Sequence, residues 1–78
     1  MRRVEFSPVC DADVRHMHYR DAERVCVAVF EFARQGTGTV EIARRGPPLV
    51  VRIRARGGFA LAVVDRELVN VRRILPVI

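Results

Sequence analysis

A chain of 78 residues, half of them hydrophobic, is long enough for one domain with a thin core and too short for two. Its 14 basic residues are all arginine and outnumber nine acidic residues, so the net charge of +5 favours a polyanionic partner. No apolar run is long enough for a membrane span and no signal-peptide pattern follows the first residues, so we expect a cytoplasmic protein.

The first half of the chain predicts a short strand and two helices. Arg3–Phe6 alternates polar and apolar residues, as a strand does. Ser7-Pro8 has the residue types of a helix N-cap and first helical position, so we expect a helix from there to about Met17. A second helix begins within residues 19–21 and stops at Gly36. It carries apolar residues at helical spacing, namely Ala22, Val25, Cys26, Val29, Phe30 and Ala33.

Four side chains in this part of the chain are assigned to packing. Cys10 and Cys26 lack CxxC spacing, so we expect buried small hydrophobes, the alternative being a disulfide between the two helices. Phe30 and Phe32 are expected in the core, with an interface as the alternative for Phe32.

The second half of the chain changes to a period of two, which is typical of strands. Residue types typical of turns at Gly46-Pro47-Pro48 and at Asp65-Arg66-Glu67 divide this half of the chain into strands. The expected strands are 40–45, Leu49–Ala55, 59–64 and 68–75, the first being irregular in the alternative interpretation. The element order predicts an α+β fold in which an N-terminal strand and helical hairpin pack on a four- to five-stranded, mainly antiparallel sheet.

Three arginines alternate through the strand Leu49–Ala55 and the turn that follows it. Residues two apart on a strand share a face and are separated by about 7 Å, roughly the phosphate spacing of a nucleic-acid strand. Arg52 and Arg54, with Arg56 as a third candidate, therefore form a basic row on one side of the sheet. The opposite side carries Leu49, Val51, Ile53 and Ala55.

The turn after this strand decides what lies beside the arginines. A three-residue loop, Arg56-Gly57-Gly58, gives one apolar and one basic face, with Ala60 beside Arg54 and Ala62 beside Arg52. A two-residue loop would place the larger apolar residues of the next strand among the arginines, so we favour the three-residue loop.

The last strand borders the basic row of Arg52 and Arg54, and the area around this row is called the basic patch. Asn70 and Arg72 face the patch, whereas Arg73 points the other way unless a β-bulge re-aims it. No acidic residue lies between Arg44 and Asp65, so we expect no local charge to neutralise the patch. The alternative is an ordinary solvated, charged sheet face.

Three segments, in order along the chain, carry a resemblance to a known family. They are Arg3-Val4-Glu5-Phe6-Ser7-Pro8, Arg52-Ile53-Arg54-Ala55-Arg56-Gly57-Gly58-Phe59 and Val71-Arg72-Arg73. With the helical hairpin, they resemble the RelE/ParE superfamily of bacterial toxin–antitoxin systems. The resemblance implies a helical hairpin on an antiparallel sheet. It also implies either a ribosome-dependent mRNA endonuclease or a gyrase poison, neutralised by an acidic, partly disordered antitoxin.

The resemblance also assigns site residues. The candidates for catalysis are Arg52, Arg54 and Arg72. The candidates for anion binding are Arg44, Arg45, Arg52, Arg54, Arg56 and Arg73. Ala60 stands where the family usually has an arginine, and no Tyr, His or Glu follows Arg73, so no general acid or base is identified. Arginine stabilises a phosphorane but transfers protons poorly. His16, His18 and Tyr19 are assigned to a solvent-facing or hairpin-packing role.

Two hypotheses follow. In the first, a RelE/ParE-like toxin presents its arginines to mRNA on the ribosome or to an acidic antitoxin. In the second, a non-catalytic binding or assembly module forms a homodimer, or binds an acidic protein, that completes the thin core. Neither hypothesis needs a membrane, a metal or a cofactor.

Overall fold

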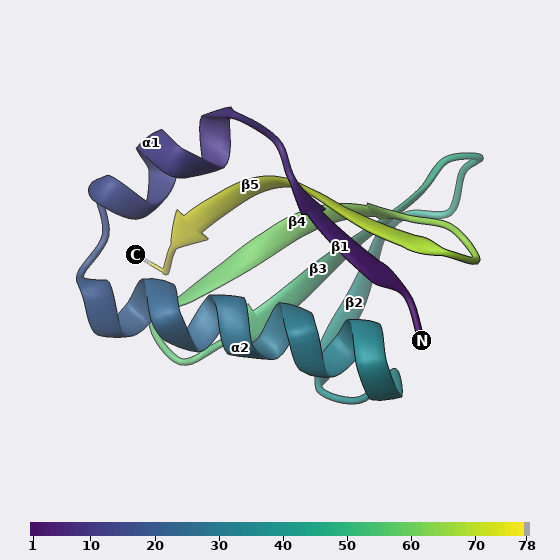
Figure 1. The fold of residues 1–78 in the computed structure, drawn as a ribbon, viewed down its shortest axis with the longest axis horizontal. Helices are drawn as coiled ribbons and strands as arrows, with labels where there is room; N and C mark the ends of the chain where they lie inside the picture. The colour runs from purple at the N-terminus through teal and green to yellow at the C-terminus, as the bar shows by residue number, and fades with distance from the viewer. Residues whose placement is uncertain (78) are drawn as a thin grey trace.

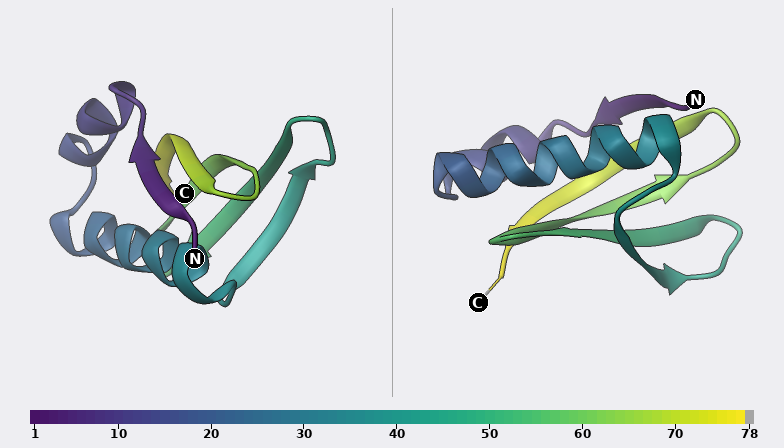
Figure 2. Two further views of the ribbon diagram at one scale, coloured as in Figure 1. Left: turned by 45° about the vertical axis from the view of Figure 1, so that its right-hand side comes forward. Right: turned by 90° about the horizontal axis from the view of Figure 1, so that it is seen from below.

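Two helices cover one face of a five-stranded sheet and leave the other face open (Figures 1 and 2). The computed structural model describes residues 1–77. Its elements are β1 Arg3–Phe6, α1 Val9–Arg15, α2 Tyr19–Gln35, β2 Thr39–Arg44, β3 Leu49–Ala55, β4 Gly58–Val64 and β5 Leu68–Pro76. The expected α+β class is therefore confirmed, and the strand predicted at residues 40–45 is regular except for one shift in its pairing with β3.

The sheet is mixed and its strand order is β1-β5-β4-β3-β2. Strands β2 to β5 form an antiparallel meander, whereas β1 pairs in parallel with β5. The β5 strand therefore lies between β1 and β4, and β1 and β2 form the two edges. This arrangement places β3 and β4, which carry the arginine row and the turn after it, in the interior of the sheet.

Helix α2 forms because its apolar residues recur on one face and because both of its ends are capped. Ala22, Val25, Val29 and Ala33 are buried against the sheet. Its first turn is capped by the His18 ring, whose Nδ1 accepts a hydrogen bond from the Arg20 backbone N–H. At its C-terminus Gly36 has a φ of 70°, the left-handed conformation in which glycine is favoured, as the sequence predicted.

Of the two phenylalanines of α2, Phe30 does not lie in the core as expected, whereas Phe32 packs against it. Phe30 is 46% exposed and packs on Phe6 of β1, with 6.1 Å between the ring centroids. It lies at the margin of the buried stripe of α2. Phe32 is partly buried against the core, and the guanidinium of Arg2 lies over its ring at 5.8 Å.

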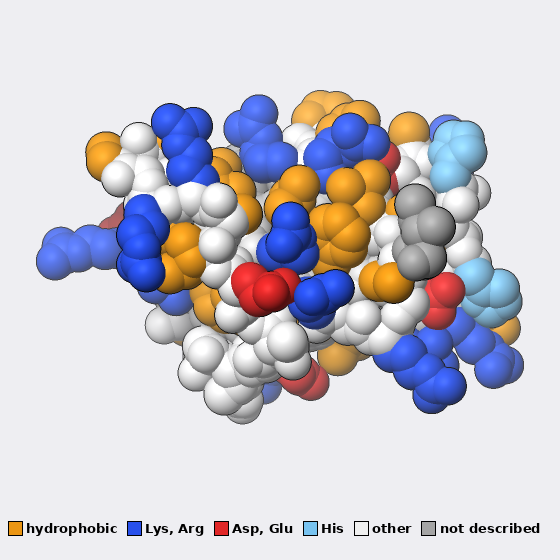
Figure 3. Space-filling model, turned by 180° about the vertical axis from the view of Figure 1, so that it is seen from behind, with side chains coloured by type: hydrophobic (Ala, Val, Ile, Leu, Met, Phe, Trp, Pro, Cys, Tyr) orange, Lys and Arg blue, Asp and Glu red, His pale blue; other side chains and the backbone are white. Residues whose placement is uncertain are grey.

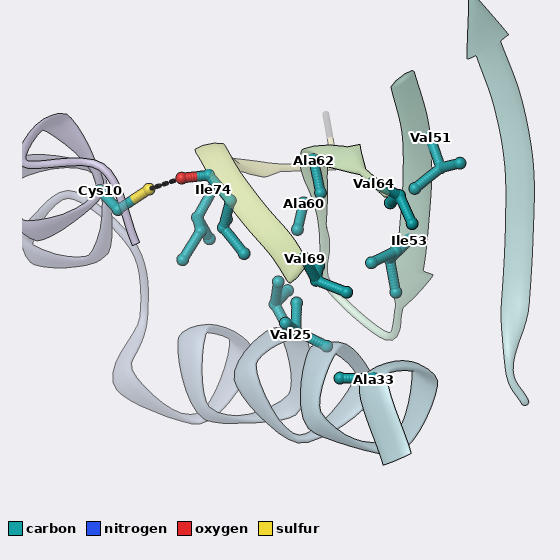
Figure 4. Close-up of a cluster of buried hydrophobic side chains, with 12 residues drawn as sticks. Cys10, Val25, Ala33, Val51, Ile53, Ala60, Ala62, Val64, Val69 and Ile74 are labelled. Carbon is teal, nitrogen blue, oxygen red and sulfur yellow. Dashed lines mark hydrogen bonds between the residues drawn. The ribbon is translucent and has the colours of Figure 1, made fainter. Parts of the chain in front are cut away.

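The core lies between α2 and the helix-facing side of β3, β4 and β5 (Figure 4). On the central strand β4 three of the four buried residues are small, namely Gly58, Ala60 and Ala62, and the fourth is Val64 at the end of the strand. A Cβ atom at Gly58 would lie 2.8 Å from both the Leu75 carbonyl oxygen and Cε of Met17. Small side chains in the middle of the sheet thus allow the helical layer to approach it closely, while larger ones on the flanking strands fill the sides.

Helix α1 begins one residue later than predicted. Its N-cap is Pro8, and the Ser7 hydroxyl donates instead to the Arg72 carbonyl of β5 at 2.8 Å, so the prediction that Ser7 caps the helix was wrong. Cys10 is buried and its thiol contacts the Val71 carbonyl at 3.4 Å (Figure 4). Both cysteines are free, as expected for small hydrophobes, although Cys26 is only half-buried. Burial raises the pKa of the Cys26 thiol, and the nearby Cys10 adds to that effect.

Candidate nucleic-acid interface

The open face, defined as the side of the sheet away from α1 and α2, carries the predicted arginine row. Val51 and Ile53 of β3 are buried toward the helices, and Arg52 and Arg54 alternate with them on the open face. Figure 3 shows arginine and hydrophobic side chains intermingled on this face. The prediction that apolar and arginine side chains of this strand alternate between the two faces of the sheet is therefore confirmed.

The register beside the arginines differs from the predicted one. Arg54 lies opposite Phe59 and Arg52 opposite Leu61, across a two-residue turn formed by Arg56 and Gly57. The prediction that small alanines flank the arginines was therefore wrong. The physical reason is the close approach of the helical layer, which takes the small residues of β4 to the helix side and leaves the larger ones on the open face. Gly57 has a φ of 88°, as the turn requires.

This register brings an aromatic ring into the basic row. The guanidinium carbon of Arg52 lies 5.3 Å from the centroid of the Phe59 ring, within the range of a cation–π contact. Phe59 is half-buried, so part of its ring is accessible on the open face.

A carboxylate also lies in the row, which the sequence analysis missed. Glu41 of β2 pairs opposite Arg52 in the sheet. One of its oxygens, Oε1, accepts a hydrogen bond from Arg54 Nη1 at 3.1 Å and lies 3.9 Å from Arg52 Nη1. The expectation that no local charge neutralises the patch was thus wrong, because the carboxylate comes from the neighbouring strand. If the residues of β2 and β3 are paired by counting outward from the turn at Gly46-Pro47, residue 41 falls opposite residue 52. This symmetry about the turn was the signal in the sequence that could have predicted the contact.

Within residues 1–77, Arg52 and Arg54 are the predicted site residues that the fold brings together around one carboxylate on the open face, that of Glu41. They remain substantially accessible: the side chains are 39% (Arg52), 47% (Arg54) and 48% (Glu41) exposed. A single carboxylate shared by two guanidiniums leaves a net charge of +1 and unused N–H donors. The trio can therefore still attract a phosphate, in competition with Glu41.

The predicted anion-binding residues Arg44, Arg45 and Arg56 and the predicted catalytic residue Arg72 lie apart from this trio. Arg56 is exposed in the turn between β3 and β4. Arg44 ends β2, and Arg45 follows it in the loop, both exposed. Arg72 is exposed at a shift in the register between β4 and β5, and its carbonyl is held by Ser7.

Arg73 has a structural partner. The β5 register shift places it opposite Leu61, so the bulge that the sequence analysis allowed for is present. Its Nε and Nη2 donate to the two carboxylate oxygens of Asp13 in α1, at 2.8 and 2.9 Å. The Ile74 backbone N–H also donates to Asp13 at 2.9 Å. The Asp13 side chain is only 8% exposed, and the Arg73 hydrogen bond lowers the pKa of its carboxyl despite the opposing effect of burial.

The histidines belong to the helical hairpin, as predicted. His16 Nδ1 lies 2.7 Å from the Ala12 carbonyl, and His18 caps α2 while stacking on Tyr19. Across the described residues there is no cluster of three or more His, Cys, Asp or Glu side chains that would hold a metal ion. In the same part of the chain, none of the helices is both long and apolar enough to cross a membrane.

Comparison of the chain with protein-family models, with curated proteins and with solved structures finds no match. The function is therefore argued from the geometry of the open face.

Proposed function

We propose that this chain is a RelE/ParE-like domain that binds single-stranded RNA on the open face of its sheet. The observation that carries the proposal is the register of β3 and β4, which sets the Phe59 ring among Arg52 and Arg54. The element order, with a strand and two helices ahead of an antiparallel meander, supports the family assignment. The net charge of +5 supports a polyanionic partner.

Single-stranded RNA needs two kinds of contact, and the open face supplies both. Phosphates are bound by cations along a groove or strip, and bases stack on aromatic rings. Arg52 and Arg54 supply the cations two residues apart on one strand, and Phe59 supplies the ring directly across from Arg54. A solvated, charged sheet face would not require an accessible aromatic ring at that position.

The trio of Arg52, Arg54 and Glu41 also has chemical groups that RNA cleavage needs. In such a reaction the 2′-oxygen attacks the adjacent phosphorus, and the bond from phosphorus to the 5′-oxygen breaks. Glu41 would take the proton of the 2′-hydroxyl, and the two guanidiniums would stabilise the charge on the phosphorane. The leaving 5′-oxygen would take its proton from water. The products would be a 2′,3′-cyclic phosphate and a 5′-hydroxyl.

Binding and cleavage are tested with two variants and one control. Arg52→Ala/Arg54→Ala should weaken the binding of a short single-stranded RNA by about 100-fold at low salt, because each charge-assisted contact is worth roughly tenfold or more. Arg20→Ala/Arg34→Ala removes the same charge from α2, on the other side of the sheet, and should change the affinity far less. Equal losses in the two double variants would mean that the open face is not the binding site.

Glu41→Gln separates binding from cleavage. It removes a competing negative charge while keeping the side-chain volume, so RNA should bind as tightly or more tightly. Primer extension on ribosome-bound message, after induced expression, should show cleavage with the unsubstituted chain and none with Glu41→Gln. Cleavage that persists in Glu41→Gln would remove Glu41 from the mechanism and leave the binding proposal intact.

A second candidate function rests on the apolar part of the same face. Leu61, Val63 and Leu75 are half-buried there, beside arginines already paired with Glu41. Such a surface suits an acidic protein partner or a second copy of the chain, as in a binding or assembly module. Size measurement of the purified protein decides: a stable dimer without affinity for RNA at low salt would favour this function over RNA binding.

A further inference from the structure

A pocket adjoins the arginine row at one end of the open face. It has a volume of about 410 Å³ and is lined by Arg54, Phe59, Leu75, Pro76 and Val77. This volume is within the range of roughly 300–1,000 Å³ that is typical of small-ligand sites. The end of β5 forms one wall, and the start of β4 forms another.

Backbone contacts hold the pocket walls in place. Phe59 pairs opposite Leu75, and Pro76 opposite Gly58, in the antiparallel ladder between β4 and β5. The Val77 N–H donates to the Gly57 carbonyl at 3.2 Å, which fixes the chain beyond the strand against the turn. Four of the five lining residues therefore belong to strands, and a backbone hydrogen bond holds the fifth, Val77.

The lining combines one aromatic ring, three apolar side chains and one cation. A ligand that fits it has a flat apolar surface for Phe59 and a negative charge near Arg54. A nucleotide has both, because its base carries π faces and its phosphate carries the charge. The Arg52 guanidinium, whose carbon lies 5.3 Å from the centroid of the Phe59 ring, places a second cation beside the same aromatic side chain.

We propose that this pocket binds a nucleobase of the single RNA strand whose phosphates contact Arg52 and Arg54, an inference that rests on the proposed function. The base stacks on Phe59, and the apolar side chains of Leu75, Pro76 and Val77 shield it from water. Apart from Arg54, the lining side chains offer no hydrogen-bonding groups. Base preference is consequently set by stacking strength rather than by readout of base edges.

Two polyanions distinguish base recognition from charge recognition: a short single-stranded RNA, and inorganic polyphosphate, which has no bases. Phe59→Leu should weaken RNA binding by about tenfold and leave polyphosphate binding nearly unchanged, because stacking on one base is lost and no charge is removed. Arg52→Ala/Arg54→Ala should weaken both. The matched control is Phe30→Leu, which alters an exposed phenylalanine of α2 and should change neither affinity.

The outcomes separate the pocket from the proposed function. If the unsubstituted chain binds neither polyanion, the proposed function fails. If the unsubstituted chain binds RNA, and Phe59→Leu lowers the affinity for RNA no more than the affinity for polyphosphate, the RNA-binding proposal stands and the base pocket is overturned.

If circular dichroism shows that Phe59→Leu does not fold, a second measurement on the unsubstituted chain takes its place. Titration of the unsubstituted chain with AMP should move the adenine proton resonances upfield through the ring current of Phe59, and unmoved resonances would overturn the inference. Displacement of bound polyphosphate by an acidic, leucine-containing peptide, but not by AMP, would also overturn it and assign the pocket to a protein segment.

Discussion

Among the arginine–carboxylate pairs of the described residues, the one at Asp13 and the one at Glu41 differ most clearly in how deeply the carboxylate is buried. Asp13 is 8% exposed and accepts hydrogen bonds from Arg73 and from a backbone N–H, so it joins α1 to β5. Glu41 is 48% exposed, and one of its oxygens is shared by Arg52 and Arg54. The same pairing of residue types thus serves the fold in one place and leaves cations accessible to a ligand in the other.

The largest expected effect is on stability at the buried site. Asp13→Asn replaces the carboxylate by a neutral isostere whose NH2 group faces the donors of Arg73 and Ile74. We expect the free energy of unfolding, measured by urea denaturation, to fall by about 2 kcal/mol. A variant as stable as the unsubstituted chain would show that this pair is no different from an ordinary surface ion pair.

The buried pair should also make stability depend on pH. The Arg73 hydrogen bond holds the pKa of Asp13 below its ordinary value. Because the folded-state pKa is the lower one, this stabilisation is complete above about pH 4, near the unfolded value, and is lost as pH falls through the folded value. The difference in unfolding free energy between the unsubstituted chain and Asp13→Asn should be constant near neutral pH and should narrow below about pH 4. A constant difference down to acid unfolding would contradict the role assigned to Asp13.

The same chemical change at the exposed site should have little effect on the fold. Glu41→Gln is expected to change the unfolding free energy by no more than about 0.5 kcal/mol, because exposed ion pairs are weak. Urea denaturation alongside Asp13→Asn makes the comparison direct. A loss as large as that of Asp13→Asn would mean that the open face is held together by its charges.

The smallest expected effect is that of Arg73 on RNA affinity. Arg73 is two strands away from Arg52, which is about one Debye length at physiological salt. Arg73→Gln should therefore lower stability but change the affinity for single-stranded RNA by no more than about twofold at physiological salt. Fluorescence anisotropy with a labelled RNA measures this, and a loss equal to that of Arg54→Ala would return Arg73 to the binding site.

Much of the fold could be predicted because it depends on local patterns. The helical spacing of Ala22, Val25 and Val29 and the alternation of Leu49–Ala55 each specify which side faces the core. Gly36 ends α2 where the sequence placed its stop. Phe30 was misjudged because helical spacing does not show how far the stripe of contacts extends around the helix.

Less of the site could be predicted, because it depends on contacts between segments. The choice between two registers at Gly57 was made by seeking one clean apolar face, whereas the packing of α2 required Ala60 and Ala62 on its own side. Glu41 was missed because its contact with Arg54 crosses between two strands. The contact of Asp13 with Arg73 was missed for the same reason, because the two residues are 60 positions apart in the chain.

The salt dependence of RNA binding tests the central claim most directly. The logarithm of the binding constant should fall linearly with the logarithm of salt concentration, with a slope of about −0.7 for each phosphate neutralised on a single strand. If Arg52 and Arg54 each neutralise one phosphate, the slope of Arg52→Ala/Arg54→Ala should be shallower by about 1.4. Equal slopes in the double variant and the unsubstituted chain would contradict the claim that this face binds RNA.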